Sequence, residues 1–310
     1  MKNTKSTKEI AVITIHGMGR EEQDYYTGFE QRLQQKLGTK WDQIAFGHIY
    51  YQDTIEPNEM AVYERMKQAK TPFVSFFVWM WLRKFLIFFL ADPTSLENGK
   101  SEKDSAYYLT QGKIADELKT IYDQLGQNKE KKVFIIAHSL GAQVISSYLW
   151  DASYSQYWGN DIPRNKRTHV GIWGSDKYVQ ENNLEGDKDK LDFILLKSLH
   201  RLYTCGCNIP LFVAGHNYIT PIKRPSPNFE WINFYNKNDV LGWPLQPLEG
   251  GKGSKDPNYP DHPTYAELVK DFEIPAGNLL QRWNPLSHLG YLTDKYFIDP
   301  IAKELEDLLH

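Results

Sequence analysis

The chain has 310 residues and a formal net charge of −3, and 41% of its residues are hydrophobic. This composition excludes wholesale disorder, and a near-neutral chain without a basic tract is not expected to bind nucleic acid. The length allows one large α/β domain or two smaller ones.

The two cysteines, Cys205 and Cys207, are separated by a single residue. This spacing suits neither a disulfide framework nor a structural zinc site. No H-E-x-x-H or C-x-x-C motif occurs, so the sequence predicts no metal and no other cofactor. The first nine residues lack the apolar stretch of a secretory signal, and with no disulfide chemistry a cytoplasmic location is expected.

Apolar runs and helical patterns alternate along the chain. The sequence predicts buried strands at residues 10–15, 44–51, 131–137, 209–214 and 229–235. It predicts helices at residues 25–37, 113–125, 142–150 and 301–309. Continuous apolar strands that alternate with helices indicate a mostly parallel sheet covered on both faces, in a single domain over residues 1–310. Residues 250–263 are predicted to form a surface loop.

One insertion, Gln52 to Thr110, interrupts this alternation and is too long for an ordinary connection. Within it, Phe73 to Leu90 has fifteen apolar residues in eighteen, eight of them Phe or Trp. Three interpretations stay open. The segment is a helical cap or lid packed on the domain, a hydrophobic element that makes peripheral membrane contact, or a membrane-spanning helix, which Arg83 and Lys84 disfavour.

The strongest chemical signal is Ala137-His138-Ser139-Leu140-Gly141, which lies between a predicted buried strand and a predicted helix. A serine hydroxyl becomes a useful nucleophile on a strained turn that a base can reach. Small residues are needed on either side, because the helix passes close to the strand there, and Ala137 and Gly141 meet this need. The helix also directs its N-terminal amides at the site.

This pattern resembles the α/β-hydrolase family, and more narrowly its lipase-like serine esterases with an A-x-S-x-G nucleophile elbow. The family's second motif, His-Gly-x-Gly, is matched by His16-Gly17-Met18-Gly19. The resemblance implies that the backbone amides of Met18 and Leu140 form the oxyanion hole, with His16, Gly17, Gly19 and Gly141 in support. Each such donor contributes roughly 3–4 kcal/mol to binding a tetrahedral intermediate. It also implies about six strands, because the first strands of the full fold are absent.

The family's chain order of nucleophile, acid and histidine limits the choice of base. His288 lies in the predicted loop before the last helix, in a Ser-His-x-Gly-Tyr pattern similar to lipase-like relatives. His216 follows a predicted strand that comes one strand too early. His262 lies among prolines and is expected to be an exposed loop residue.

The acid should follow the predicted strand at residues 229–235. Asp239 lies just beyond it, in a D-V-x-G sequence similar to the family's acid loop. A buried aspartate there would fix the imidazole tautomer and stabilise the imidazolium. A turn aspartate that caps its own loop is the alternative, and Asp192 and Asp294 are weaker candidates for the acid.

The sequence therefore predicts a cofactor-independent serine esterase with Ser139, Asp239 and His288 as its catalytic residues. The aromatic insertion favours small-molecule esters with lipophilic acyl groups, or lipids, as substrates. Acyl transfer to an acceptor other than water is not separated from hydrolysis. The alternative function is a membrane- or partner-docking module that keeps the hydrolase scaffold with little or no catalysis.

Overall fold

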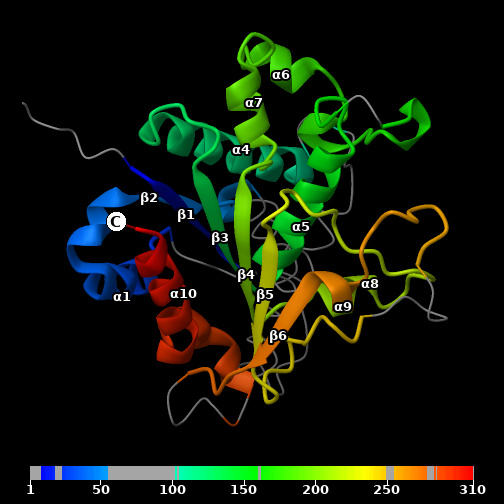
Figure 1. The fold of residues 1–310 in the computed structure, drawn as a ribbon. Coiled ribbons are helices and arrows are strands. Elements are labelled where there is room, and N and C mark those ends of the chain that lie inside the picture. Colours follow the sequence, from blue (N-terminus) through cyan, green and yellow to red (C-terminus); the bar gives the residue numbers. More distant parts are fainter. Residues whose placement is uncertain are drawn as a thin grey trace, which may run out of the picture.

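The computed structural model describes residues 8–17, 23–54, 102, 105–159, 162–248, 255–277, 283 and 285–309. Within them, six strands form one sheet in the order β2-β1-β3-β4-β5-β6 (Figure 1). All neighbouring strands are parallel. The strands are β1 (Ile10–Ile15), β2 (Ile44–Ile49), β3 (Lys132–His138), β4 (Leu199–Cys205), β5 (Glu230–Tyr235) and β6 (Val269–Glu273).

Helices of different lengths connect these strands. The longer ones are α1 (Thr27–Leu37), α4 (Ala106–Gln124), α5 (Leu140–Ser153), α7 (Lys188–Ile194) and α10 (Lys295–Leu308). The shorter ones are α6 (Lys177–Glu181), α8 (Ile209–Val213) and α9 (Tyr265–Leu268). The 3-10 turns are η1 (Gly38–Gln43), η2 (Arg164–Lys166), η3 (Gly171–Trp173), η4 (Pro285–Leu289) and η5 (Tyr291–Thr293).

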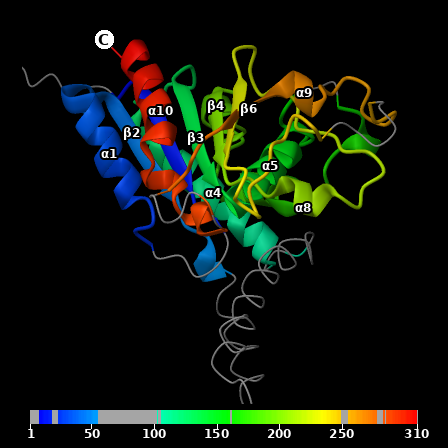
Figure 2. The ribbon, with the colours of Figure 1, turned by 90° about the horizontal axis from the view of Figure 1, so that it is seen from below.

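The helices cover the sheet on both faces (Figure 2). Helices α1 and α10 pack on one face, where Phe29 and Ile301 join Val12 and Ile136 in one buried cluster. Helices α4, α5 and α7 pack on the other face in a second and larger cluster. Each fully buried aliphatic or aromatic side chain contributes about 1.5–3 kcal/mol. Alternate residues of a strand belong to the two clusters, which is the pattern of a parallel sheet covered by helices on both faces.

The strand order reverses direction next to β1. Chain connections lead from β1 to β2 on one side, and then to β3 on the other. In open α/β sheets, such a switch point leaves a crevice at the carboxyl ends of the two diverging strands. Here those ends carry His16 and Gly17 after β1, and Ser139 after β3.

The prediction of an α/β fold with a mostly parallel sheet of about six strands is confirmed. The strand predicted at residues 209–214 is wrong, because this apolar run forms helix α8. Pro210 lies in the first turn of α8, where its missing N–H leaves no hydrogen bond unmade. A central strand does not tolerate proline, so Pro210 is the residue in the sequence that distinguishes a helix from a strand here.

Two strands were missed. Strand β4 contains His200 and Arg201, which interrupt the apolar run that marks a buried strand. Among the described strands, β6 lies at the edge of the sheet and pairs with β5, and it exposes polar residues such as Lys270. Both strands are held by pairing with a neighbour rather than by a local pattern.

The last helix begins six residues earlier than the predicted start at Ile301. Asp294 caps α10 by accepting a hydrogen bond of 2.8 Å from the amide of Tyr296. Pro300 lies inside the helix. It is exposed, and because proline has no N–H it donates no hydrogen bond to the preceding turn of the helix.

Most of the insertion Gln52 to Thr110 lies outside the described residues, and Phe73 to Leu90 lies entirely outside them. The interpretations of that segment therefore stay predictions. No helix among the described residues combines the length and the apolar character needed to cross a bilayer. Residues 255–263 form turns, as predicted for the loop at 250–263.

Candidate active site

Ser139 lies at a sharp turn between β3, which ends at His138, and α5, which begins at Leu140. Its backbone has φ 53° and ψ −122°, a conformation that L-residues rarely adopt and that costs about 1–3 kcal/mol. The amide of Ser139 donates a hydrogen bond of 2.9 Å to the carbonyl of Cys205 on β4. The sheet therefore holds the serine in a strained geometry.

Two glycines make this turn sterically feasible. A β-carbon on Gly141 would lie 2.5 Å from the carbonyl oxygen of His16, so α5 passes directly against the end of β1. A β-carbon on Gly17 would lie 2.7 Å from the β-carbon of Ser139 and 3.3 Å from its hydroxyl oxygen. The backbone at Gly17 therefore lies directly beside the serine hydroxyl, where no side chain would fit.

His288, on η4, reaches the serine. Its Nε2 is 2.8 Å from Oγ of Ser139, and its Nδ1 is 2.9 Å from Oδ2 and 3.1 Å from Oδ1 of Asp239. Asp239 lies just past β5. The three side chains are 1%, 7% and 4% exposed, in the order Ser139, His288, Asp239, so solvent does not compete for these hydrogen bonds. One continuous chain of hydrogen bonds thus joins a hydroxyl, an imidazole and a carboxylate.

The surroundings of Asp239 favour its ionised form. Burial alone would raise the pKa of its carboxyl, but hydrogen bonds and the charge of His288 outweigh burial and lower that pKa. The amide of Leu241 donates to Oδ1 at 2.9 Å, and the hydroxyl of Tyr291 donates to Oδ2 at 3.0 Å. An anion held beside Nδ1 keeps the proton on that nitrogen and leaves Nε2 to accept from the serine.

Further contacts fix the position of His288. Nε2 of His138 donates to the carbonyl of His288 at 2.8 Å, and the two imidazole centroids are 4.9 Å apart. Burial lowers the pKa of His138 to about 3, so its ring is neutral. Tyr291 also accepts a hydrogen bond of 2.8 Å from the amide of Asn236, which ties η5 to the loop that carries Asp239.

Two more glycines at this site were not identified from the sequence. A β-carbon on Gly206, whose φ is +56°, would lie 3.0 Å from Cε1 and Nδ1 of His288. One on Gly242 would lie 2.4 Å from Oδ2 of Asp239. Gly206 lies between the two cysteines, directly after β4. Because the sequence did not predict β4, it also did not indicate that Gly206 lies at the carboxyl edge of the sheet.

His16 has a structural environment. Its Nδ1 donates to the carbonyl of Gly17 at 2.7 Å, and its Nε2 accepts from the amide of Tyr51 at 3.1 Å. The ring stacks on Tyr51 with centroids 4.0 Å apart. Burial lowers the pKa of His16 to about 4, which keeps it neutral. The hydroxyl of Tyr51 donates to the carbonyl of Gly17 at 3.0 Å, so both side chains fix the backbone beside Ser139.

Leu140 is the first residue of α5, where backbone amides have no partner within the helix. Its amide follows Ser139 directly and can serve an oxyanion there. The other predicted donor, Met18, and the supporting Gly19 lie outside the described residues, so their roles stay predictions.

The other candidate residues lie elsewhere. The expectation that His262 is exposed is wrong: it is 2% exposed, and it bonds to the hydroxyl of Tyr154 and the carbonyl of Pro221, each at 2.7 Å. His216 follows α8, not a strand. Asp192, a weaker candidate for the acid, lies within α7, where it pairs with Lys197 at 2.5 Å.

Asp294 is also engaged away from His288. It caps α10 and accepts a further hydrogen bond of 2.9 Å from the amide of Gly277. Within the described part of the chain, no three His, Cys, Asp or Glu side chains come together as a metal site requires.

No protein-family model matches the chain, and neither does any curated protein. The arrangement of Ser139, His288 and Asp239 is therefore interpreted by its geometry alone.

Proposed function

We propose that the protein is a serine hydrolase of the α/β-hydrolase class that cleaves carboxylic esters through an acyl-enzyme on Ser139. One observation carries the proposal: His288 contacts Oγ of Ser139 through Nε2 and the carboxylate of Asp239 through Nδ1. A hydroxyl, an imidazole and a buried carboxylate in this order are the parts of a nucleophile–base–acid triad.

The chemistry follows from these contacts. The hydroxyl of Ser139 attacks the ester carbonyl while Nε2 of His288 takes its proton, and Asp239 stabilises the imidazolium that forms. The same proton then passes to the departing alkoxide, which leaves as the alcohol. Water attacks the acyl-enzyme in the second half of the cycle, again with His288 as base, and releases the carboxylic acid.

The strained turn and the glycines beside it support the same interpretation. The conformation of Ser139 is what presents a nucleophile at the top of a sheet in this class of enzyme. The close approach of Gly17 places a backbone beside the hydroxyl, as an oxyanion hole needs. A lipophilic acyl group is suggested only by Phe73 to Leu90, and the alternative docking function rests on the same segment. Both therefore stay predictions of the sequence.

The test compares two buried serines at opposite ends of α5. Ser139→Ala should lower kcat for a nitrophenyl ester by more than about ten-thousandfold, since removing a triad nucleophile abolishes its chemistry. It should also lose labelling by a fluorophosphonate. Ser153→Ala is the control, because Ser153 is buried and its hydroxyl donates to the carbonyl of Trp150, away from His288. Turnover or labelling that survives in Ser139→Ala, with the fold intact by circular dichroism, would refute the proposal.

A further inference from the structure

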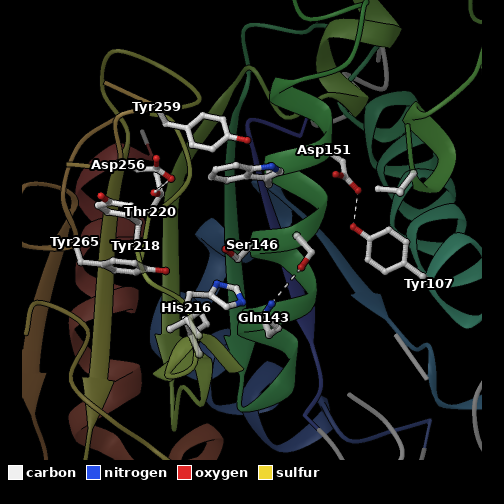
Figure 3. A pocket seen from close by; sticks show the side chains of 15 residues that line it. Tyr107, Gln143, Ser146, Asp151, His216, Tyr218, Thr220, Asp256, Tyr259 and Tyr265 are labelled. Carbon is white, nitrogen blue, oxygen red and sulfur yellow. Dashed lines mark hydrogen bonds between the residues drawn. The ribbon is translucent and has the colours of Figure 1, made fainter. Parts of the chain in front are cut away.

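A cavity of about 400 Å³ runs along one side of α5 (Figure 3). This volume lies within the range of small-molecule sites, about 300–1,000 Å³. Helix α5 forms one wall, and residues 216–220 with Asp256, Tyr259 and Tyr265 form the opposite wall (Figure 3). The side chain of Tyr107 closes one side, where its hydroxyl donates to Asp151 at 2.5 Å.

The cavity begins about one helical turn along α5 from the proposed nucleophile, and Ser139 itself does not line it. Gln143, Ser146, Ser147 and Trp150 line it from α5, and their spacing places them on one helical face. Gln143 lies one turn after Ser139, about 6 Å along the helix axis, and Trp150 lies about 16 Å along it. The cavity therefore extends away from Ser139 over the length of a small organic group.

The same end of the cavity is close in sequence to the histidine contact. Ile209 lines the cavity and follows Gly206, which lies against His288, by three residues. An ester carbonyl at Ser139 would therefore lie about one helical turn from the nearest lining residue of the cavity, Gln143.

The lining of the cavity is rich in hydrogen-bonding groups. Of the fifteen residues that line it, all but Val170, Ile209 and Val213 carry a side-chain donor or acceptor. Ser146, His216 and Tyr218 make no side-chain hydrogen bond within the described residues, so their polar groups are available to a ligand. The ring of Tyr265 is buried, with the residue 3% exposed, and its hydroxyl is likewise uncommitted there. A neutral ligand with several hydroxyls would match this lining, whereas an alkyl chain would leave it unpaired.

The charges in the lining select against anions. The cavity carries the carboxylates of Asp151 and Asp256, and no Lys or Arg is among the described residues that line it. Asp256 accepts hydrogen bonds from the amide of Asn258 at 2.8 Å and from Thr220 at 3.4 Å, and it pairs with no described cation. Asp256 can accept a further hydrogen bond from a hydroxyl group, whereas Asp151 already accepts from Tyr107, Gln111 and Thr168. Both carboxylates repel phosphate or carboxylate ligands.

Aromatic rings in the lining suit the apolar faces of a sugar ring. Trp150 and Tyr259 pack edge to face with centroids 5.1 Å apart, and both border the cavity with Tyr218. The faces of a sugar ring present C–H bonds while its edge presents hydroxyls. Aromatic side chains provide an apolar surface for such faces, and the polar side chains between them serve the hydroxyls.

We propose that this cavity binds a polyhydroxylated, uncharged alcohol portion of the substrate, such as a sugar or similar polyol esterified at one hydroxyl. This inference rests on the proposed function, because it takes Ser139 as the nucleophile. The cavity is assigned to the alcohol portion of the ester rather than to the acyl portion, because a polyol forms an ester most simply through one of its own hydroxyls.

The first test measures selectivity between two esters with the same acyl chain, glucose octanoate and methyl octanoate. Ser146→Leu fills the cavity from the half-buried face of α5 and should lower the ratio of their kcat/KM values about tenfold, the effect of losing one or two hydrogen bonds. Ser175→Leu, at an exposed serine outside the cavity, should leave the ratio unchanged. If Ser146→Leu does not fold, Asp256→Asn provides the same test on the opposite wall. An unchanged ratio in the folded cavity variant would overturn the inference.

A binding experiment separates failure of this inference from failure of the proposed function. Methyl glucoside should give a saturation-transfer NMR signal with Ser139→Ala protein and lose it when Ser146→Leu is added. Methyl glucuronide, its anionic counterpart, should compete poorly. If the wild-type protein cleaves neither ester but the glucoside signal follows this pattern, the esterase proposal fails and the sugar site stands. Absence of the signal, or equal competition by the glucuronide, overturns the sugar site whatever the esterase result.

Discussion

Helix α5 borders two regions that differ in how their polar groups are used. At its N-terminal end, every polar group of Ser139, His288 and Asp239 that the proposed chemistry uses is engaged with another protein group, and glycines clear the space around them. Along its side, hydroxyl groups such as that of Ser146 face a cavity and find no partner in the described chain. The first region is preorganised as the proposed reaction would need, while the second has hydrogen-bonding capacity left for the proposed ligand.

If the first region carries out the chemistry and the second binds part of the substrate, changes near His288 should slow the reaction of every ester. Changes along α5 should instead discriminate between esters.

The largest expected effect is at Gly206. Gly206→Ala would place a methyl group 3.0 Å from two ring atoms of His288, and moving that ring by even 1 Å can cost about a hundredfold in kcat. Gly126→Ala is a matched control, because Gly126 also has a positive φ, +69°, but has no atom within 4 Å of a built β-carbon.

Both glycine variants should lose about 1–2 kcal/mol of stability from backbone strain, and only Gly206→Ala should lose activity. Denaturant unfolding and nitrophenyl ester kinetics check the two effects separately. Equal activity in the two variants would show that His288 does not need its observed position.

A smaller effect is expected at Tyr291. Tyr291→Phe removes a hydrogen bond from Oδ2 of Asp239, which raises the pKa of that carboxyl and loosens its orientation toward His288. We expect kcat to fall about tenfold with KM unchanged, since the loss of one hydrogen bond to a charged group is worth about 1.5 kcal/mol or more.

Tyr235→Phe, on β5, is the control for loss of a tyrosine hydroxyl outside the Asp239 contacts. A rise in KM without a change in kcat in Tyr291→Phe would instead assign this tyrosine to substrate binding.

The smallest effect on catalysis, but a clear one on stability, is expected at His138. Burial lowers its pKa from 6.5 to about 3, so below pH 6.5 the unfolded chain binds a proton that the folded protein does not. The free energy of unfolding should therefore fall as pH decreases from about 6.5 toward 3, by up to about 1.4 kcal/mol per pH unit from this residue.

His138→Gln keeps a donor for the carbonyl of His288 and removes the titration. Urea unfolding at several pH values should show a shallower decline in this variant than in the wild type. Parallel declines would mean that His138 is protonated in the folded protein.

The two regions also differ in how far the sequence could predict them. Ser139 was predicted from five adjacent residues, because a strand, a small-residue turn and a helix are encoded locally. Asp239 and His288 were chosen by chain order and by position between predicted elements, and the structure brings both to Ser139. Their catalytic roles stay predictions. The cavity was not predicted, because its lining comes from five separate stretches of the chain.

The errors in the sequence predictions have two different origins. The run at residues 209–214 is apolar enough for a strand or a helix, and only its position after β4 and the proline in its first turn decide for α8. His262 has polar neighbours in sequence, yet Tyr154 and Pro221, which are distant in the chain, bury it. At His262, contacts between distant segments override the local pattern, whereas at residues 209–214 the sequence itself contained the deciding signal, Pro210.

The amino-acid sequence by itself determined the α/β alternation and the strained serine turn, because hydrophobic period and small residues act over a few neighbouring positions. Only the tertiary structure decided that Gly206 clears the space for His288, that His138 and Tyr291 contact His288 and Asp239, and that a polar cavity follows α5. These features depend on which strands lie side by side. That order is set by burial of the whole sheet between its two helical layers.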